Sequence, residues 1–182
     1  MTRPPIRFAY DAEKAGEVAA RLVHLAGGSM PLVKLLKLMY LADRNSLIDT
    51  GSPITGDAVV AMDMGPVLSK TYNHLKPPAD LPFVARTEGG PVTLAAGVPE
   101  NGRLSDYEVD LVERVFGKFG GKSGQQLSDI LHANAKEWAS PDGSSRLIDP
   151  AEILRAAGKS EEEIEAIAQE ARYFVSVHPY LT

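Results

Sequence analysis

Apolar positions recur at helical spacing along much of the chain. From Asp11 to Ala26, alanine, valine and leucine stand three and four residues apart, which predicts an amphipathic helix with Asp11 as its cap. In the next segment Ser29 is the expected cap and Pro31 fits the first turn. This segment is apolar on nearly every side up to Asp49. Such a helix is normally covered by its neighbours, so we expect it at the centre of the fold.

The middle of the chain carries a weaker β pattern. Residues 58–62 are apolar and contain two valines, which favours a short strand or extended segment. Residues 82–87 and 91–95 flank a glycine-containing turn and predict a β-hairpin. Between these parts, residues 66–75 begin with a proline and end before two more, which predicts a helix.

Helix signals return after this region and decide the predicted fold class. Four further helices are expected to begin at caps, namely Ser105, Ser123, Asp149 and Ser160. We therefore predict a mainly α protein: a single-domain helical bundle over residues 1–182, built around a buried central helix with a small β-hairpin or sheet appendage. The aromatic-rich C-terminal tail, residues 173–182, either docks on the core as an extended segment or offers a peptide to a partner.

Composition narrows the class of protein. The chain has no cysteine, which excludes disulfides, thiolate metal sites and cysteine nucleophiles. A formal net charge of −5 argues against nucleic acid as a partner, because binding to phosphates usually requires a basic surplus. No apolar run approaches the ~18 residues of a membrane span, and the N-terminus lacks the apolar core of a signal peptide. We expect a cytoplasmic protein without a membrane partner.

Candidate chemistry is sparse. Residues 120–123 resemble the end of a P-loop but lack its first glycine, and the four histidines show no metal-ligand spacing. There is no Gly-x-Ser-x-Gly nucleophile motif either. We expect no catalytic residue, metal or cofactor, and a protein that is not an enzyme. A hydrolase that uses His132 with a distant acid, and a DNA-binding regulator, remain the alternatives.

Polar residues on the apolar central helix form the main candidate site. Lys37, Tyr40 and Arg44 share one helix face, and Asp43 lies on the neighbouring stripe. Polar groups in such a setting must pair internally, reach water or meet a partner. Two interpretations stay open: a partner-binding face, or an internal network in which Asp43 accepts N–H bonds from the turn at residues 55–57. Both interpretations can hold together.

Three motifs add a family resemblance. Residues 37–43, residues 51–57 and the Met-Gly-Pro-Val of residues 64–67 resemble the Panacea domain, the SocA-like antitoxin family, and the likeness runs from Leu32 to Trp138. It implies a mostly helical antitoxin that binds a cognate protein toxin encoded beside it. The size and layout resemble the proteolytic-adaptor type, which delivers its toxin to the ClpXP protease; simple masking of the toxin is the alternative. Our predicted partner-binding residues are Lys37, Tyr40, Asp43, Arg44, Asp57 and Trp138.

Overall fold

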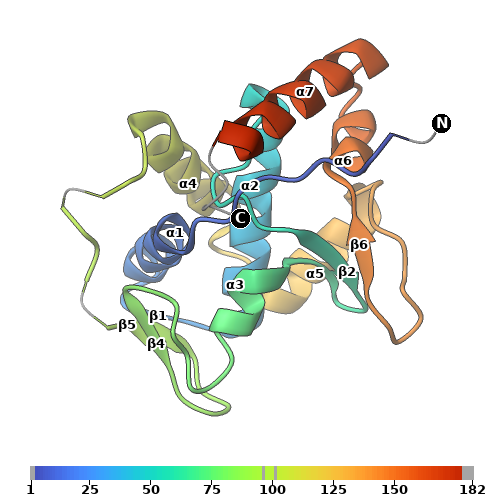
Figure 1. The fold of residues 1–182 in the computed structure, drawn as a ribbon. Helices are drawn as coiled ribbons and strands as arrows, with labels where there is room; N and C mark the ends of the chain where they lie inside the picture. Colours follow the sequence, from blue (N-terminus) through green and yellow to red (C-terminus); the bar gives the residue numbers. More distant parts are fainter. Residues whose placement is uncertain (1–2, 96, 101, 178–182) are drawn as a thin grey trace.

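The computed structural model describes residues 3–95, 97–100 and 102–177. Within these ranges it contains seven helices and two three-stranded antiparallel sheets (Figure 1). The elements in chain order are α1 (Ala12–Leu25), β1 (Ser29–Met30), α2 (Leu32–Thr50), β2 (Val59–Met62), β3 (Gly65–Leu68), α3 (Ser69–His74), β4 (Val84–Arg86), β5 (Val92–Leu94), α4 (Asp106–Phe119), α5 (Gly124–Asn134), β6 (Arg146–Ile148), α6 (Pro150–Ala156) and α7 (Glu161–Val177). The protein is therefore an α+β fold, and the predicted mainly α bundle is wrong.

The helix starts that the sequence marked with caps at Asp11, Ser105, Ser123 and Asp149 are confirmed. The Asp11 side chain accepts a hydrogen bond from Lys14 N at the start of α1, 2.9 Å away. Capping boxes begin α4 at Ser105, α5 at Ser123 and α6 at Asp149. These predictions succeed because a cap depends only on residues within one turn of it.

The first sheet has the strand order β1-β5-β4. Its β4–β5 hairpin was predicted, but its third strand was not, because Ser29 pairs with Thr93 and Met30 with Val92. Ser29 is therefore a strand residue and does not cap α2, whose N-cap is Pro31 without a side-chain hydrogen bond. A two-residue strand is too short to show the alternation by which strands are recognised.

The second sheet has the order β3-β2-β6. The expected strand at residues 58–62 is confirmed as β2, but residues 65–68 form β3, so the helix predicted from Pro66 begins only at Ser69. Gly65 adopts φ +97°, a conformation that glycine accepts readily and that allows β2 to turn back into β3. The strand β6 pairs with β2 across a long stretch of chain and was not predicted.

Helix α2 contacts α1, α4, α5, α6 and β3. In Figure 1 it runs through the middle of the view, with α1 and α4 on one side and β6 and α6 on the other. Leu35, Leu38 and Met39 are fully buried along it, and so are Lys37 and Tyr40 to within 1 %. The polar groups of Lys37 and Tyr40 are therefore cut off from water and need partners inside the protein.

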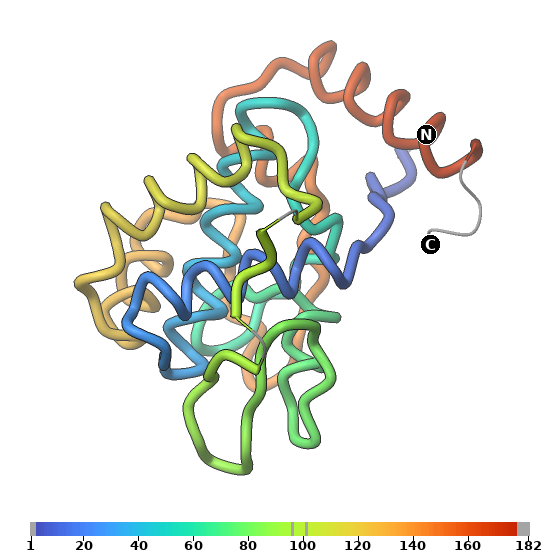
Figure 2. Tube along the Cα trace, turned by 90° about the vertical axis from the view of Figure 1, so that its left-hand side faces the viewer, coloured from blue at the N-terminus to red at the C-terminus, as the bar shows by residue number. Residues whose placement is uncertain are grey.

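The N-terminal segment and α7 lie together at one side of the molecule (Figure 2). Tyr173 to Val177 form the last turns of α7, so the extended form expected there is wrong, and the rest of the predicted tail lies outside the described residues. Two aromatic side chains at this end are open to solvent, with Tyr173 70 % and Phe174 46 % exposed. Across the described part of the chain, none of the helices combines the length and apolar character needed to span a bilayer.

Candidate functional site

Two of the predicted residues on α2 share one buried carboxylate. Tyr40 Oη donates to Glu137 Oε1 over 2.5 Å, and Arg44 Nε donates to the same oxygen over 2.6 Å. Burial acts to raise the pKa of Glu137, but the hydrogen bonds from Arg44 and Tyr40 outweigh it and hold that pKa below its ordinary value. Glu137 is thus ionised and paired. The sequence interpretation missed it, because nothing near residue 137 indicates that it meets α2.

Asp43 holds the loop that follows α2. Its Oδ1 accepts a hydrogen bond from Thr55 N at 3.1 Å, and its Oδ2 accepts one from Thr55 Oγ1 at 2.5 Å. Burial raises the pKa of Asp43 to about 7, although the hydrogen bonds from Thr55 act to lower it. The predicted internal network, in which Asp43 accepts from the turn at residues 55–57, is confirmed.

Asp57 continues this network to the next helix. Its two carboxylate oxygens accept from Lys70 N at 3.0 Å and Thr71 N at 2.7 Å, in the first turn of α3. The N-cap position of α3 is Leu68, which makes no side-chain cap. Asp57, distant in the chain, therefore satisfies the free N–H groups that a local cap normally satisfies.

Lys37 and Trp138 both fasten the β2–β3 hairpin. Lys37 Nζ donates to the carbonyl oxygen of Pro66 over 3.0 Å, and Trp138 Nε1 donates to the carbonyl oxygen of Met62 over 3.0 Å. The Trp138 ring stacks on His132 with 4.0 Å between ring centroids. These contacts connect α2 and α5 to the turn of the hairpin.

The structure thus gives the six predicted partner-binding residues internal contacts. Four of them are buried, and Arg44 and Trp138 keep some exposed surface. Their contribution to partner binding stays a prediction. In this conformation their side chains hold together the helix, the loop and the hairpin that carry the three motifs.

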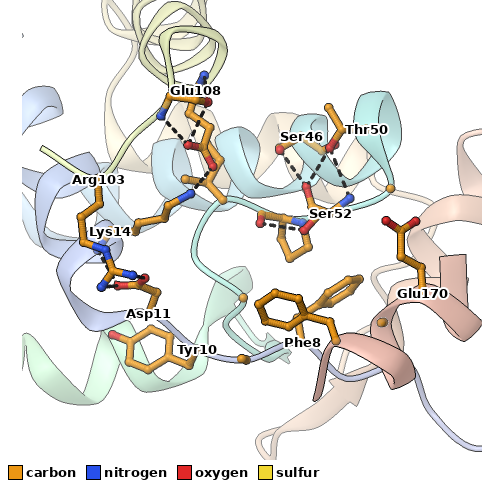
Figure 3. Close-up of a pocket in the computed structure, with 18 of the residues that line it drawn as sticks. Phe8, Tyr10, Asp11, Lys14, Ser46, Thr50, Ser52, Arg103, Glu108 and Glu170 are labelled. Carbon is orange, nitrogen blue, oxygen red and sulfur yellow. Dashed lines mark hydrogen bonds and ion pairs between the residues drawn. The ribbon is translucent and has the colours of Figure 1, made fainter. Parts of the chain in front are cut away.

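A groove of about 690 Å³ lies beside this framework. Four segments line it: residues 8–14 before and at the start of α1, residues 46–56 at the end of α2, residues 103–108 at the start of α4, and residues 167–174 of α7. Figure 3 shows Phe8 between the loop at Ser52 and the helix that carries Glu170. No sequence pattern indicated this groove, because its walls are far apart in the chain.

One wall of the groove is a single face of α7. Ile167, Glu170, Ala171 and Phe174 follow one another at spacings of three and four, so they point the same way from the helix. Gly51 lies against this wall, since a Cβ placed on it would stand 3.1 Å from Ile167 Cγ1. The groove therefore offers an apolar surface that depends on how closely α7 packs on the loop after α2.

The charged residues of the groove give it an acidic balance. Lys14 pairs with Glu108 at 2.7 Å, and Arg103 pairs with Asp11 at 2.9 Å (Figure 3). Arg103 also reaches Glu13 at 3.2 Å. The lining includes one further carboxylate, Glu170, which forms no ion pair within the described ranges, so that four carboxylates face two cations. A partner segment with a basic residue complements this arrangement.

No group of three or more histidine, aspartate or glutamate residues able to hold a metal ion occurs on the described part of the chain. The groove has the size of a ligand site and is lined by both apolar and polar residues. Surfaces of this kind bind segments of other molecules through apolar contact at the centre and polar contact at the edge.

Comparison with known proteins assigns the chain to a family. A family model described as antitoxin SocA-like, Panacea domain, matches residues 35–139, more than half of the 182 residues. No curated protein and no solved structure matches the chain. The match contains the whole polar network, whereas residues 8–14 and 167–174 of the groove lie outside it. Antitoxins of this kind have a toxin as partner, which points to a non-enzymatic role. The chain belongs to the SocA-like antitoxin family, the Panacea domain family.

Proposed function

We propose that this antitoxin binds its cognate protein toxin directly in the groove between the N-terminal segment and α7, and that it delivers the bound toxin to the ClpXP protease in the cytoplasm. The observation that carries the binding step is the groove of about 690 Å³, with one apolar helix face as its wall. The delivery step rests on the resemblance to the proteolytic-adaptor type of the family.

The lining of the groove indicates what kind of toxin segment fits. Phe8 and Phe174 supply aromatic surface, and aromatic residues are common anchors in protein interfaces. The excess of carboxylates favours a segment that carries lysine or arginine beside its apolar residues. Two of the four lining segments lie outside the family match, so this surface can differ between family members that recognise different toxins.

The predicted partner-binding residues enter this proposal mainly as support for the surface. Asp43 fixes Thr55, and the loop that includes residues 51–54 and 56 lines the groove. Asp57 anchors the end of the same loop to α3. The buried side chains of Lys37 and Tyr40 act further from the groove, through the packing of α2.

A charge reversal at Glu170 tests the groove. Glu170→Lys changes the sign of an exposed, unpaired position on the groove wall, and we expect it to weaken toxin binding at least tenfold in a pull-down or calorimetric titration. Glu113→Lys is the matched control, because Glu113 is also exposed in the middle of a helix but lies outside the groove. Equal toxin binding by the two variants, both folded by circular dichroism, would remove the groove from the proposal.

The delivery step needs a separate experiment. Co-expression of this chain with the adjacent small open reading frame, with and without ClpXP, should restore growth and shorten the lifetime of the neighbour only when ClpXP is present. Rescue with a long-lived neighbour in a stable complex would establish masking in place of delivery. Absence of both toxicity and a complex would contradict the proposed pairing altogether.

A further inference from the structure

A second cavity of about 250 Å³ lies on another side of the molecule and shares no lining residue with the groove. It lies between the first turns of α2 and the β2–β3 turn, with Tyr72 and the loop at residues 143–144 also contributing. Most of its surface is apolar, from Leu32, Val33, Leu36, Met62, Met64 and Val67. Its one cationic residue is Lys37.

Lys37 is an unusual residue for an apolar cavity. It is only 1 % exposed, and within the described ranges no carboxylate forms an ion pair with it. Its ammonium group carries three N–H donors, and the acceptor found for it is the carbonyl oxygen of Pro66. Burial lowers the pKa of Lys37 to about 8, so at neutral pH the amine is protonated and charged in most molecules. A buried charge without a counter-ion is costly, and an anion beside it offsets part of that cost.

A second side-chain nitrogen, His132 Nε2, lies near Lys37 Nζ. His132 Nε2 is buried and has no hydrogen-bond partner. A Cβ placed on Gly65 would stand 3.2 Å from Lys37 Nζ and 3.4 Å from His132 Nε2, so both nitrogens pack closely against Gly65, although His132 itself does not line the cavity. Gly65 lines the cavity, and its φ of +97° disfavours any larger residue there.

We propose that this cavity binds a carboxylate carried on a small apolar group. The carboxylate accepts a hydrogen bond from Lys37 Nζ, and the apolar group lies against Leu36 and the other apolar lining residues. Asp63, the one carboxylate in the lining, is exposed and accepts a hydrogen bond from Gly143 N at 3.1 Å, so it does not neutralise Lys37. Two sources share this ligand chemistry: the C-terminal residue of a polypeptide and a free short-chain acid.

The position of Trp138 provides a direct readout. It is the only tryptophan of the chain, it donates to the carbonyl of the cavity residue Met62, and its ring stacks on His132. We expect N-acetyl-leucine to change the fluorescence of the full chain with saturation in the millimolar range or below, and N-acetyl-leucine amide to give no saturable change. A response to N-acetyl-leucine but not to 4-methylpentanoate identifies a polypeptide C-terminus as the ligand, and the reverse identifies a free acid.

Variants of Lys37 complete the test. Lys37→Met should weaken binding at least tenfold, whereas Lys136→Met, which removes an exposed lysine near Trp138, should leave it unchanged. If Lys37→Met does not fold, Lys37→Gln keeps an N–H donor for the carbonyl oxygen of Pro66, removes the charge, and should weaken binding several-fold. Equal responses to the acids and the amide, or full binding by the folded variants, would overturn the proposal. No toxin is used, so either outcome leaves the groove hypothesis as it stands.

Discussion

Tyr40 and Glu137 lie 97 residues apart in the chain and share a hydrogen bond of 2.5 Å between buried side chains. Arg44 donates to the same carboxylate, so one acid joins the central helix to the segment that follows α5. The sequence made Tyr40 and Arg44 candidates for a partner face. Their contacts give them a structural role, while their part in partner binding stays a prediction, and both roles can be measured.

Removing the shared acid should be costly. Glu137→Ala leaves the buried Tyr40 hydroxyl and the partly buried Arg44 guanidinium without their acceptor. We expect the free energy of unfolding to fall by about 3 kcal/mol, measured by urea denaturation. The exposed Glu113→Ala should change it by less than about 0.5 kcal/mol. A loss below about 1 kcal/mol for Glu137→Ala would mean that water reaches and satisfies the two donors.

A milder change separates structure from recognition at Tyr40. Tyr40→Phe removes one donor to Glu137 and keeps the ring in the core, so the free energy of unfolding should fall by about 1 kcal/mol. Because the side chain is fully buried, the folded variant should bind toxin as the original chain does. Loss of toxin binding in a folded Tyr40→Phe variant would favour a direct partner-binding role for this helix face.

Asp57 should stabilise α3 from a distance. In Asp57→Ala the N–H groups of Lys70 and Thr71 lose their acceptor, and we expect a loss of about 1–2 kcal/mol, as for removal of a helix cap. Amide exchange at Lys70 and Thr71 should quicken. The exposed Asp110→Ala serves as the control. Unchanged exchange at the start of α3 would show that these hydrogen bonds contribute little.

The raised pKa of Asp43 predicts an acid-side dependence of stability. The folded state takes up the Asp43 proton at about pH 7 and the unfolded state only near 3.8, so the folded state binds more protons between these values. The free energy of unfolding therefore falls as pH rises from about 4 to 7, by on the order of 4 kcal/mol. In Asp43→Asn, denaturation curves should not show this fall in the free energy of unfolding between about pH 4 and 7. Parallel pH profiles for the two proteins would contradict it.

Lys37 predicts the opposite slope at alkaline pH. Its pKa falls from 10.5 to about 8 on folding, so the unfolded state binds more protons between these values. The free energy of unfolding should rise between pH 8 and 10.5, by on the order of 3 kcal/mol, and Lys37→Met should not show this rise. Chemical denaturation across this range measures it. If Lys37→Met had the same pH profile of unfolding free energy as the original chain, the Lys37 charge would be in contact with water in the folded state.

The sequence by itself determined the local features. Caps such as Asp11 and Ser105 act within one helical turn, and a hairpin turn acts within a few residues, so both were predicted correctly. The motif residues 37–43 and 51–57 also carried the family, because a family likeness is a property of the sequence. The Asp43 network was one of two open interpretations, since its partner stands only 12 residues away.

The tertiary structure decided what depends on distant segments. Ser29 lies in a strand because it pairs with Thr93, and Tyr40 has a structural role because its hydroxyl donates to Glu137. The groove exists only where four separate segments come together, and the Lys37 cavity only where α2 meets the β2–β3 turn. Pairing and burial are set by which surfaces pack against each other, and short strands and single acids leave no periodic signal of their future neighbours.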